Sequence, residues 1–187
     1  CGTSIAAGGS CTVSVTFHPS ASGTRTGNLT VTSNATNSPS TVALTGTGTT
    51  ASTNLALHKA TTESNHTQTY ASGNVTDGNQ GTYWESVNGS WPAWVQVDLG
   101  AAQSVSRVVL QLPTTWGARN ETLSILGSTD GTTFTTLKTS ATYTFSPSTN
   151  TVTITFPTTT QRYLRVNITA NNVQNGGQIS ELQVWNS

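Results

Sequence analysis

Short stretches in which apolar and polar residues alternate dominate the pattern of the second part of the chain. The clearest runs from Trp94 to Leu99, where tryptophan, valine and leucine alternate with glutamine and aspartate. A period of two is that of a β-strand with one buried face. Similar stretches lie at 105–111, 122–128, 151–156, 163–169 and 179–185, and Asp130-Gly131 is a hairpin-turn signal between two of them. No segment shows a helical period, so we predict an all-β fold.

The first part of the chain has a weaker pattern. Three strand-like runs, Cys11 to Phe17, Gly27 to Ser33 and Thr41 to Leu44, are separated by glycine and proline. Three strands form a thin sheet with a poor core. Residues 49–53 are small and polar, which is typical of a linker. We therefore expect a partial β module at 1–48, a linker at 49–53, and a domain at 54–187 that is long enough to bury its own core.

Charge excludes several classes of partner. The chain has 187 residues with seven Lys and Arg, seven Asp and Glu, and a formal net charge of zero. Binding to nucleic acid through phosphate neutralisation requires a basic patch, which this composition does not provide. No apolar stretch approaches the roughly 20 residues that span a bilayer. The first residues lack the basic start and apolar core of a signal peptide, so we expect a mature or excised piece.

The two cysteines, Cys1 and Cys11, lie near the start of the chain. They could bridge the ends of adjacent strands, or they could be two buried free thiols. The composition rich in Thr, Ser, Asn and Gly is typical of extracellular proteins, in which disulfides persist. We therefore favour a Cys1–Cys11 disulfide and a secreted, extracellular location.

Six sequence blocks in the second part carry a resemblance to a known family. They are NLALHKATTES, NVTDGNQGTYWES, WVQVDLG, LSILGSTDGTTF, RYLRVNIT and ISELQVW, and they cover residues 54–187 in order. Together they resemble the discoidin family, the type C domain of coagulation factors five and eight. The resemblance implies a jelly-roll-like β-sandwich with ligands bound by loops at one end. Its bacterial members are carbohydrate-binding modules, many attached to glycoside hydrolases. Residues 1–48 resemble the back half of an Ig-like spacer repeat of bacterial secreted enzymes.

An oxygen-rich turn at Asp77-Gly78-Asn79 suggests a calcium site, because Ca²⁺ prefers carboxylate and carbonyl oxygens. The family often binds calcium here, which implies these ligands: the carbonyls of Asn74, Asn79 and Ser180, the side chains of Asp77 and Glu181, and both oxygens of Thr82. The alternative is an ordinary turn and a solvated strand end. Two of only seven acidic residues fall on the matching positions, so we favour a structural Ca²⁺.

The five tryptophans divide into two groups. Trp94 and Trp185 lie in strand-like runs, and Trp84 lies at a position that the resemblance implies is buried, so all three are expected to pack in the core or on the sheet. Trp91 and Trp116 lie in loops, where an indole suggests ligand contact. An edge plug beside Pro92 is an equally good explanation for Trp91. Sugars bind to aromatic platforms that are supplemented by a few polar groups.

The resemblance places ligands at four loops, 64–70, 85–91, 113–120 and 171–177. These loops supply our candidate carbohydrate-binding residues, which are Glu85, Arg119, Trp116, Trp91, Asn88, Asn120, Tyr70, His66 and Asn175. Glu85 and Arg119 lead, because charged groups make strong hydrogen bonds to hydroxyls. A surface ion pair is the competing interpretation for these two, and a plain surface role is the competing one for His66. Galactose-binding members often have histidine where this chain has Glu85. The run from Trp84 and the run at 112–123 resemble modules of actinobacterial glucan-degrading enzymes.

Three function classes follow. The first is a non-catalytic module, monomeric within a larger glycoside hydrolase, that binds polysaccharide or oligosaccharide, with a glucan as the implied ligand. The second is an enzyme, which we disfavour because a glycosidase needs paired carboxylates and none is evident among Glu63, Glu85 and Glu121. The third is a cell-surface or membrane adhesion domain, which the scarcity of Lys and Arg disfavours.

Overall fold

Residues 4–19, 22–48 and 52–186 are described by a computed structural model, in which the chain divides into two units. Unit 1 comprises Cys1–Ala51 and unit 2 comprises Ser52–Ser187. The predicted linker at 49–53 spans this division, and its first three residues lie outside the described ranges. Cys1 also lies outside them, so the Cys1–Cys11 disulfide stays a prediction.

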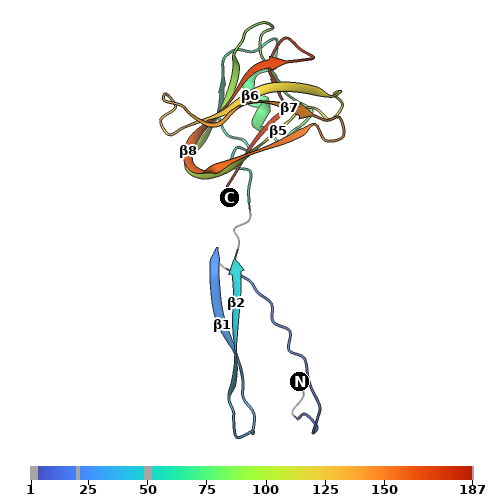
Figure 1. The fold of residues 1–187 in the computed structure, drawn as a ribbon, viewed down its shortest axis with the longest axis vertical. Helices are drawn as coiled ribbons and strands as arrows, with labels where there is room; N and C mark the ends of the chain where they lie inside the picture. Colours follow the sequence, from blue (N-terminus) through green and yellow to red (C-terminus); the bar gives the residue numbers. More distant parts are fainter. Residues whose placement is uncertain (1–3, 20–21, 49–51, 187) are drawn as a thin grey trace. The chain divides into compact units, whose positions relative to one another are not determined.

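Unit 1 contains one antiparallel pair of strands, β1 (Gly23–Val31) and β2 (Ser40–Gly48) (Figure 1). Their positions confirm two of the three expected strands, with β1 beginning and ending earlier than predicted. The third expected strand, Cys11 to Phe17, is wrong, because this segment is irregular and the sheet has only two strands. Alternation supplies a strand's side-chain pattern, but a strand also needs a neighbour that accepts its backbone hydrogen bonds.

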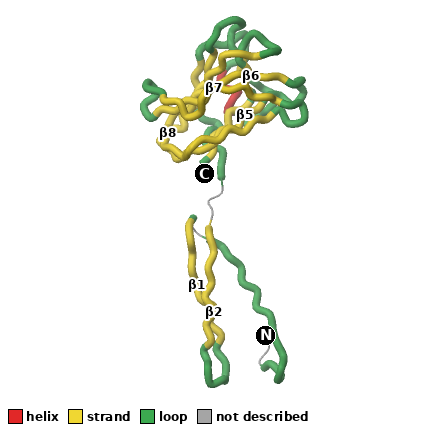
Figure 2. Tube along the Cα trace, in the orientation of Figure 1, coloured by secondary structure: helices red, strands yellow, loops and turns green. Residues whose placement is uncertain are grey.

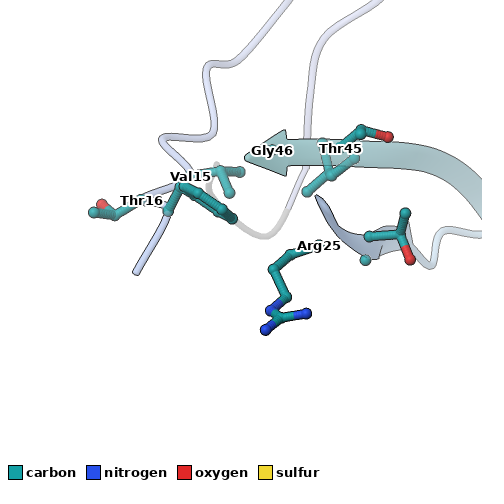
Figure 3. A pocket seen from close by; sticks show the side chains of 9 residues that line it. Val15, Thr16, Arg25, Thr45 and Gly46 are labelled. Carbon is teal, nitrogen blue, oxygen red and sulfur yellow. The ribbon is translucent and has the colours of Figure 1, made fainter. Parts of the chain in front are cut away.

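The apolar side chains of unit 1 are poorly covered. An open cavity of about 580 Å³ separates part of the irregular segment from the hairpin (Figure 3). It is lined by Val15, Thr16, Phe17, Arg25, Thr26, Gly27, Leu44, Thr45 and Gly46. Val13, Val15 and Val42 are each more than half exposed. Unit 1 therefore buries little apolar surface, as a thin sheet must, and its Ig-like character stays a prediction.

The regular elements of unit 2 are strands, apart from one short 3₁₀ turn (Figures 1 and 2). The elements are β3 (Thr61–Glu63), the short 3₁₀ turn η1 (Ser72–Thr76), β4 (Trp84–Glu85), β5 (Ala93–Gln111), β6 (Arg119–Ser128), β7 (Thr135–Phe145), β8 (Thr151–Asn171), β9 (Gln178–Ile179) and β10 (Glu181–Trp185). The main antiparallel sheet has the order β10-β5-β8-β6-β7, with β3 also paired to β5, and β4 pairs with β9. This confirms the all-β prediction. None of the described residues forms a helix long and apolar enough to cross a membrane.

The two longest strands each join two of the predicted stretches. β5 covers both 94–99 and 105–111, and β8 covers both 151–156 and 163–169. Their pairing shifts register between Asp98 and Gln103 and again between Val105 and Arg107. Such irregularities bend a strand without ending it, so the break in alternation marks a bend. The edge strand β7 was not predicted, because most of its side chains are exposed and lack an apolar face.

Alternation along β5 sorts its side chains between the core and the outer face. Val95, Val97 and Leu99 are almost fully buried. They join a core whose other members include Val75, Trp84, Leu110, Leu123, Ile125, Phe145, Leu164, Val166, Ile168 and Leu182. Burying one such aliphatic side chain contributes roughly 1.5–3 kcal/mol. The buried position of Trp84 is as expected, whereas Trp94 stacks on the Arg165 guanidinium at 4.0 Å.

Backbone hydrogen bonds gather the polar loops at one end of unit 2. Thr67 N–H donates to the Glu85 carbonyl (3.0 Å), and Ser86 N–H donates to the Gly177 carbonyl (3.0 Å). Gly89 N–H donates to the Asn175 carbonyl at 2.7 Å. The segment at 113–120 is attached to the same end, because Asn172 N–H donates to the Asn120 carbonyl at 3.1 Å. The loops that the resemblance grouped together are therefore neighbours, and we call this region the loop end.

We expect the two units to differ in their ability to fold alone. A fragment of residues 52–187 should melt cooperatively, because it contains a complete buried core. A fragment of residues 1–51 should show no cooperative transition, since a single hairpin with exposed apolar side chains is marginal in water. Calorimetry of the two fragments and the intact chain checks this. A sharp transition in fragment 1–51 would contradict it.

Candidate functional site

Glu85 and Arg119 meet at the loop end through a third residue that the sequence had not singled out. Glu85 ends β4, and its pairing partner in β9 is Gln178. The Gln178 amide donates from Nε2 to Glu85 Oε2 at 2.6 Å, and its Oε1 accepts a hydrogen bond from Arg119 Nη1. All three side chains are more than nine-tenths buried. The expected carboxylate and guanidinium are therefore brought together, with an amide between them.

A second carboxyl, that of Glu121, lies beneath this network. Its side chain is fully buried, and Oε1 accepts hydrogen bonds from the Gln178 backbone N–H (3.2 Å) and from Asn171 Nδ2 (2.9 Å). Burial raises the pKa of Glu121 well above its usual value, although these hydrogen bonds and the Arg119 charge oppose the rise. Burial also lowers the pKa of the Arg119 guanidinium, and the charges of Glu121 and Glu85 counteract this.

Part of the bonding capacity of this network is unused. Arg119 Nε and Glu121 Oε2 are buried and have no hydrogen-bond partner among the described residues. The hydroxyl of Tyr143 is also buried without a hydrogen-bond partner among the described residues. Tyr143 is the residue opposite Glu121 in the β6–β7 pairing. Buried polar atoms without partners are costly and call for an explanation such as an ordered water or a ligand. These three atoms could therefore bind a buried water or a polar group of a ligand.

Aromatic rings cover one side of the network. The Arg119 guanidinium lies 4.1 Å from the centre of the Trp116 ring. Tyr83 meets Trp116 edge to face at 4.6 Å and stacks on Tyr70 at 4.5 Å. Burial, followed by the hydrogen bond with Tyr70, raises the pKa of Tyr83. Trp116 is half-buried and rests against the core, so it can present only part of its indole to a ligand.

The exposed amides form a rim beside Glu85. Gln174 Nε2 donates to Glu85 Oε1 at 2.8 Å and to Asn88 Oδ1 at 3.2 Å. Trp91 Nε1 donates to Asn175 Oδ1 at 3.1 Å. This rim places three further candidates, Asn88, Trp91 and Asn175, next to the Glu85–Gln178–Arg119 network. The indole N–H of Trp91 is engaged by the protein, which fits a role in holding two loops together.

The remaining two candidates make their hydrogen bonds elsewhere. His66 Nδ1 lies 2.6 Å from Glu63 Oε1, and the pair joins β3 to the following loop. The backbone N–H of Asn120 donates to Asn172 Oδ1 at 2.7 Å. His66 lies in a loop and Asn120 is the second residue of β6, and neither extends the buried network.

Four residues of the site were absent from the sequence prediction: Gln178, Gln174, Tyr83 and Glu121. No strand pattern marks Tyr83, because it lies just before the two-residue strand β4, in which both residues are buried. Gln174 and Gln178 lie in a polar run before the last strand, where composition alone does not separate an amide in solvent from a buried one. Glu121 was noted only as a spare carboxylate.

The predicted calcium ligands form a separate cluster between the turn after η1 and the start of β10. Asp77 Oδ1 accepts from Asn79 N–H (2.8 Å), and Asp77 Oδ2 accepts from Thr82 Oγ1 (2.6 Å). The Asn79 carbonyl accepts from Thr82 N–H at 3.1 Å. Glu181 makes a side-chain hydrogen bond with Asp77. The structure thus brings together four of the six predicted ligands through direct contacts.

The chemistry of this cluster suits a hard divalent cation. Burial, followed by the neighbouring Asp77, raises the pKa of Glu181 to about 7, and Glu181 Oε1 is buried without a partner. Two adjacent carboxyls repel each other when both are ionised, and a cation between them removes that cost. The last two predicted ligands flank the cluster, where Asn74 Nδ2 donates to the Tyr83 carbonyl and Ser180 Oγ to the Gln80 carbonyl. Within the described ranges no three His, Cys, Asp or Glu side chains are close enough together to hold a metal ion. The two carboxylates of this cluster would therefore have to be supplemented by carbonyl and hydroxyl oxygens.

Comparisons with known proteins agree with this geometry. Residues 74–166 match the F5/F8 type C family model described as a NedA-like, galactose-binding domain. Chitosan-binding module 1 of a chitosanase/glucanase from Paenibacillus sp. IK-5 is 32% identical, with a TM-score of 0.61 over 71% of this chain and 98% of that module. Module 2 of the same enzyme, in complex with chitotriose, is 31% identical, with a TM-score of 0.58 over 70% of this chain and 98% of that module.

A third solved structure extends the comparison to another ligand. The carbohydrate-binding module of AlyQ, in complex with 4,5-unsaturated mannuronic acid, is 28% identical, with a TM-score of 0.58 over 68% of this chain and 95% of that one. A search of curated proteins gives no significant match. The solved relatives confirm the jelly-roll-like sandwich and a carbohydrate-binding role for this fold. Through unit 2, the chain belongs to the F5/F8 type C, galactose-binding-like family of carbohydrate-binding modules.

Proposed function

We propose that unit 2 is a non-catalytic module that tethers a secreted glycoside hydrolase to polysaccharide, and that its ligand is a glucan or an amino-substituted glucan. The observation that carries this proposal is the Glu85–Gln178–Arg119 network, which lies against Trp116 at the loop end. A carboxylate and a guanidinium beside an aromatic ring are the groups that orient and stack a sugar. The chain would act as one part of a larger, extracellular enzyme.

The charge of the loop end favours neutral or cationic sugars. Glu63 and Glu85 supply carboxylates here, while Arg119 supplies the guanidinium, which is already hydrogen-bonded to Gln178. A uronate polymer would bring further negative charge toward these carboxylates, and like charges in a partly desolvated site repel. A glucan brings no charge, and chitosan brings positive charge. Two chitosan-binding modules that are 31–32% identical to this chain support the same preference for neutral or cationic sugars over uronates.

One observation favours a second candidate function, adhesion to membranes. Val87 and Val173 lie in neighbouring loops of the loop end and are 44% and 58% exposed. Exposed apolar side chains on loops can enter a lipid surface, but stable membrane binding also requires basic residues. The guanidinium of Arg119 at this end is buried. Sedimentation with anionic liposomes separates the two functions, since the carbohydrate proposal expects no co-sedimentation.

We further propose that the cluster around Asp77 holds a structural Ca²⁺. Asp77, Asn79, Thr82 and Glu181 would hold it, with Asn74 and Ser180 completing the set that the resemblance implies. The contact between Asp77 and Glu181 and the unpartnered Glu181 Oε1 support this assignment. The ion would join the turn after η1 to the first residue of β10 and would have no part in binding sugar directly.

Removal of calcium should lower the melting temperature of the wild-type protein by several degrees. An ion that binds only the folded state stabilises it by about 2.7 kcal/mol at a hundredfold excess over its dissociation constant. Asp77→Ala should melt at the same temperature with Ca²⁺ and with EDTA. Asp130→Ala, which removes an exposed carboxylate from the turn between β6 and β7, is the matched control and should keep the full response. Identical wild-type melting curves in Ca²⁺ and EDTA would refute the site.

The carbohydrate proposal predicts that Trp116→Ala weakens retention on insoluble chitosan and β-glucan about tenfold or more, because the stacking surface is lost. A tenfold change corresponds to about 1.4 kcal/mol. Trp94→Ala is the matched control, since it removes a half-buried tryptophan from the outer sheet face and should leave retention unchanged. Pulldown assays with melting curves for both variants provide the test. Equal retention of Trp116→Ala and wild type, or no retention of wild type by either polymer, would contradict the proposal.

A further inference from the structure

The partners of the Gln178 amide determine its orientation. An ionised carboxylate can only accept hydrogen bonds, and a guanidinium can only donate them. Glu85 must therefore face the NH₂ group of Gln178, and Arg119 must face its oxygen, which is the arrangement observed. A side chain that could only donate or only accept would leave one of the two charged partners without a bond.

Gln178 is also held firmly in place. Its backbone N–H donates to Glu121 Oε1 (3.2 Å), and its Oε1 accepts a second hydrogen bond from Asn171 Nδ2 (3.3 Å). Its side chain is 4% exposed, and its backbone is paired with Glu85 in the β4–β9 ladder. The amide is therefore anchored from β4, β6 and the end of β8. In this position it lies between its two charged neighbours.

Because the Gln178 amide lies between them, Glu85 and Arg119 do not form a direct ion pair. Buried opposite charges that lie close together gain most from a direct bidentate pair. The ion pairs among the described residues are His66–Glu63 and Arg162–Asp98, so Glu85 and Arg119 do not form one. Arg119 Nε keeps an unused donor, which a direct pair with Glu85 could otherwise consume.

We propose that Gln178 is the positioning residue of the carbohydrate site, because it prevents Glu85 and Arg119 from neutralising each other. Each charged group then keeps bonding capacity for a ligand that offers both a donor and an acceptor, as a pair of neighbouring sugar hydroxyls does. This inference rests on the proposed function for the identity of the ligand. The separation of the two charges, however, can be tested without any ligand.

Gln178→Leu tests the separation directly. Leucine offers neither a donor nor an acceptor, so the Glu85 carboxylate and the Arg119 guanidinium each lose a partner and should move around it into direct hydrogen-bonding contact in its crystal structure. Binding of chitotriose and of cellotriose, measured by calorimetry, should fall at least tenfold in protein that still melts cooperatively. Gln183→Leu is the matched control, because Gln183 lies in β10 and bonds to Gln111, outside the site. It should bind like wild type.

Gln178→Glu adds a pH profile that a merely structural role would not produce. The introduced carboxyl would face Glu85 from β4 and Glu121 and Arg119 from β6, with Tyr83 beside them. Burial among carboxyls favours its protonated form. When protonated it donates to Glu85 and accepts from Arg119, as the amide does, and when ionised it can only accept. The affinity of Gln178→Glu relative to wild type at the same pH should therefore recover as pH falls from about 8 to 5.

Failure of the proposed carbohydrate function and failure of the proposed role of Gln178 give different results. Wild type that binds neither trisaccharide refutes the proposed function, while the crystal structure of Gln178→Leu still decides whether Gln178 holds the charges apart. Should Gln178→Leu not fold, the pH profile of Gln178→Glu decides instead. Unchanged separation of Glu85 and Arg119 in Gln178→Leu overturns the inference. The inference is also overturned if Gln178→Leu binds sugar as tightly as wild type. A ratio of Gln178→Glu affinity to wild-type affinity that stays constant across the pH range overturns it as well.

Discussion

Burial of charge without direct neutralisation is the constraint on which the loop end depends. Glu85, Arg119 and Glu121 are each more than nine-tenths buried, and a buried ionisable group is tolerated only when hydrogen bonds replace its lost water. The Gln178 amide and the Gln174 and Asn171 side chains supply those bonds. The loops are therefore held by a polar network that has a specific geometry, in addition to the apolar core beneath it.

The segment from β9 to β10 connects this network with the rest of unit 2. Gln178 bridges the charges of the loop end, and Glu181, a few positions later, contacts Asp77 in the proposed calcium cluster. Between them, Ser180 N–H donates to the Gln111 carbonyl at the end of β5 (2.8 Å). An ion that fixes the start of β10 would thus also stiffen the segment that carries Gln178. The proposed calcium cluster and the proposed carbohydrate site would then share one structural support.

The sequence was most informative where side-chain chemistry repeats along the strands. Alternation predicted the buried faces of β5, β6 and β8, and the family resemblance grouped the loops that the backbone hydrogen bonds later join. The pattern failed at Cys11–Phe17, where no neighbouring strand pairs with the segment, and at β7, whose exposed edge carries no apolar face. It also missed Gln178, because burial of an amide depends on the charged residues that meet it from distant strands. Long-range polar contacts of this kind leave no local signal.

Unit 2 is proposed to bind sugar at the loop end through the Glu85–Gln178–Arg119 network and Trp116. The most direct test is a titration of ¹⁵N-labelled protein with chitotriose, followed through the side-chain signals of Arg119 Nε, Trp116 Nε1 and the Gln178 amide. The account predicts that these three signals shift together and saturate, while the indole signal of Trp94 on the outer sheet face stays in place. Saturable shifts at Trp94 with none at Arg119 and Gln178 would contradict it.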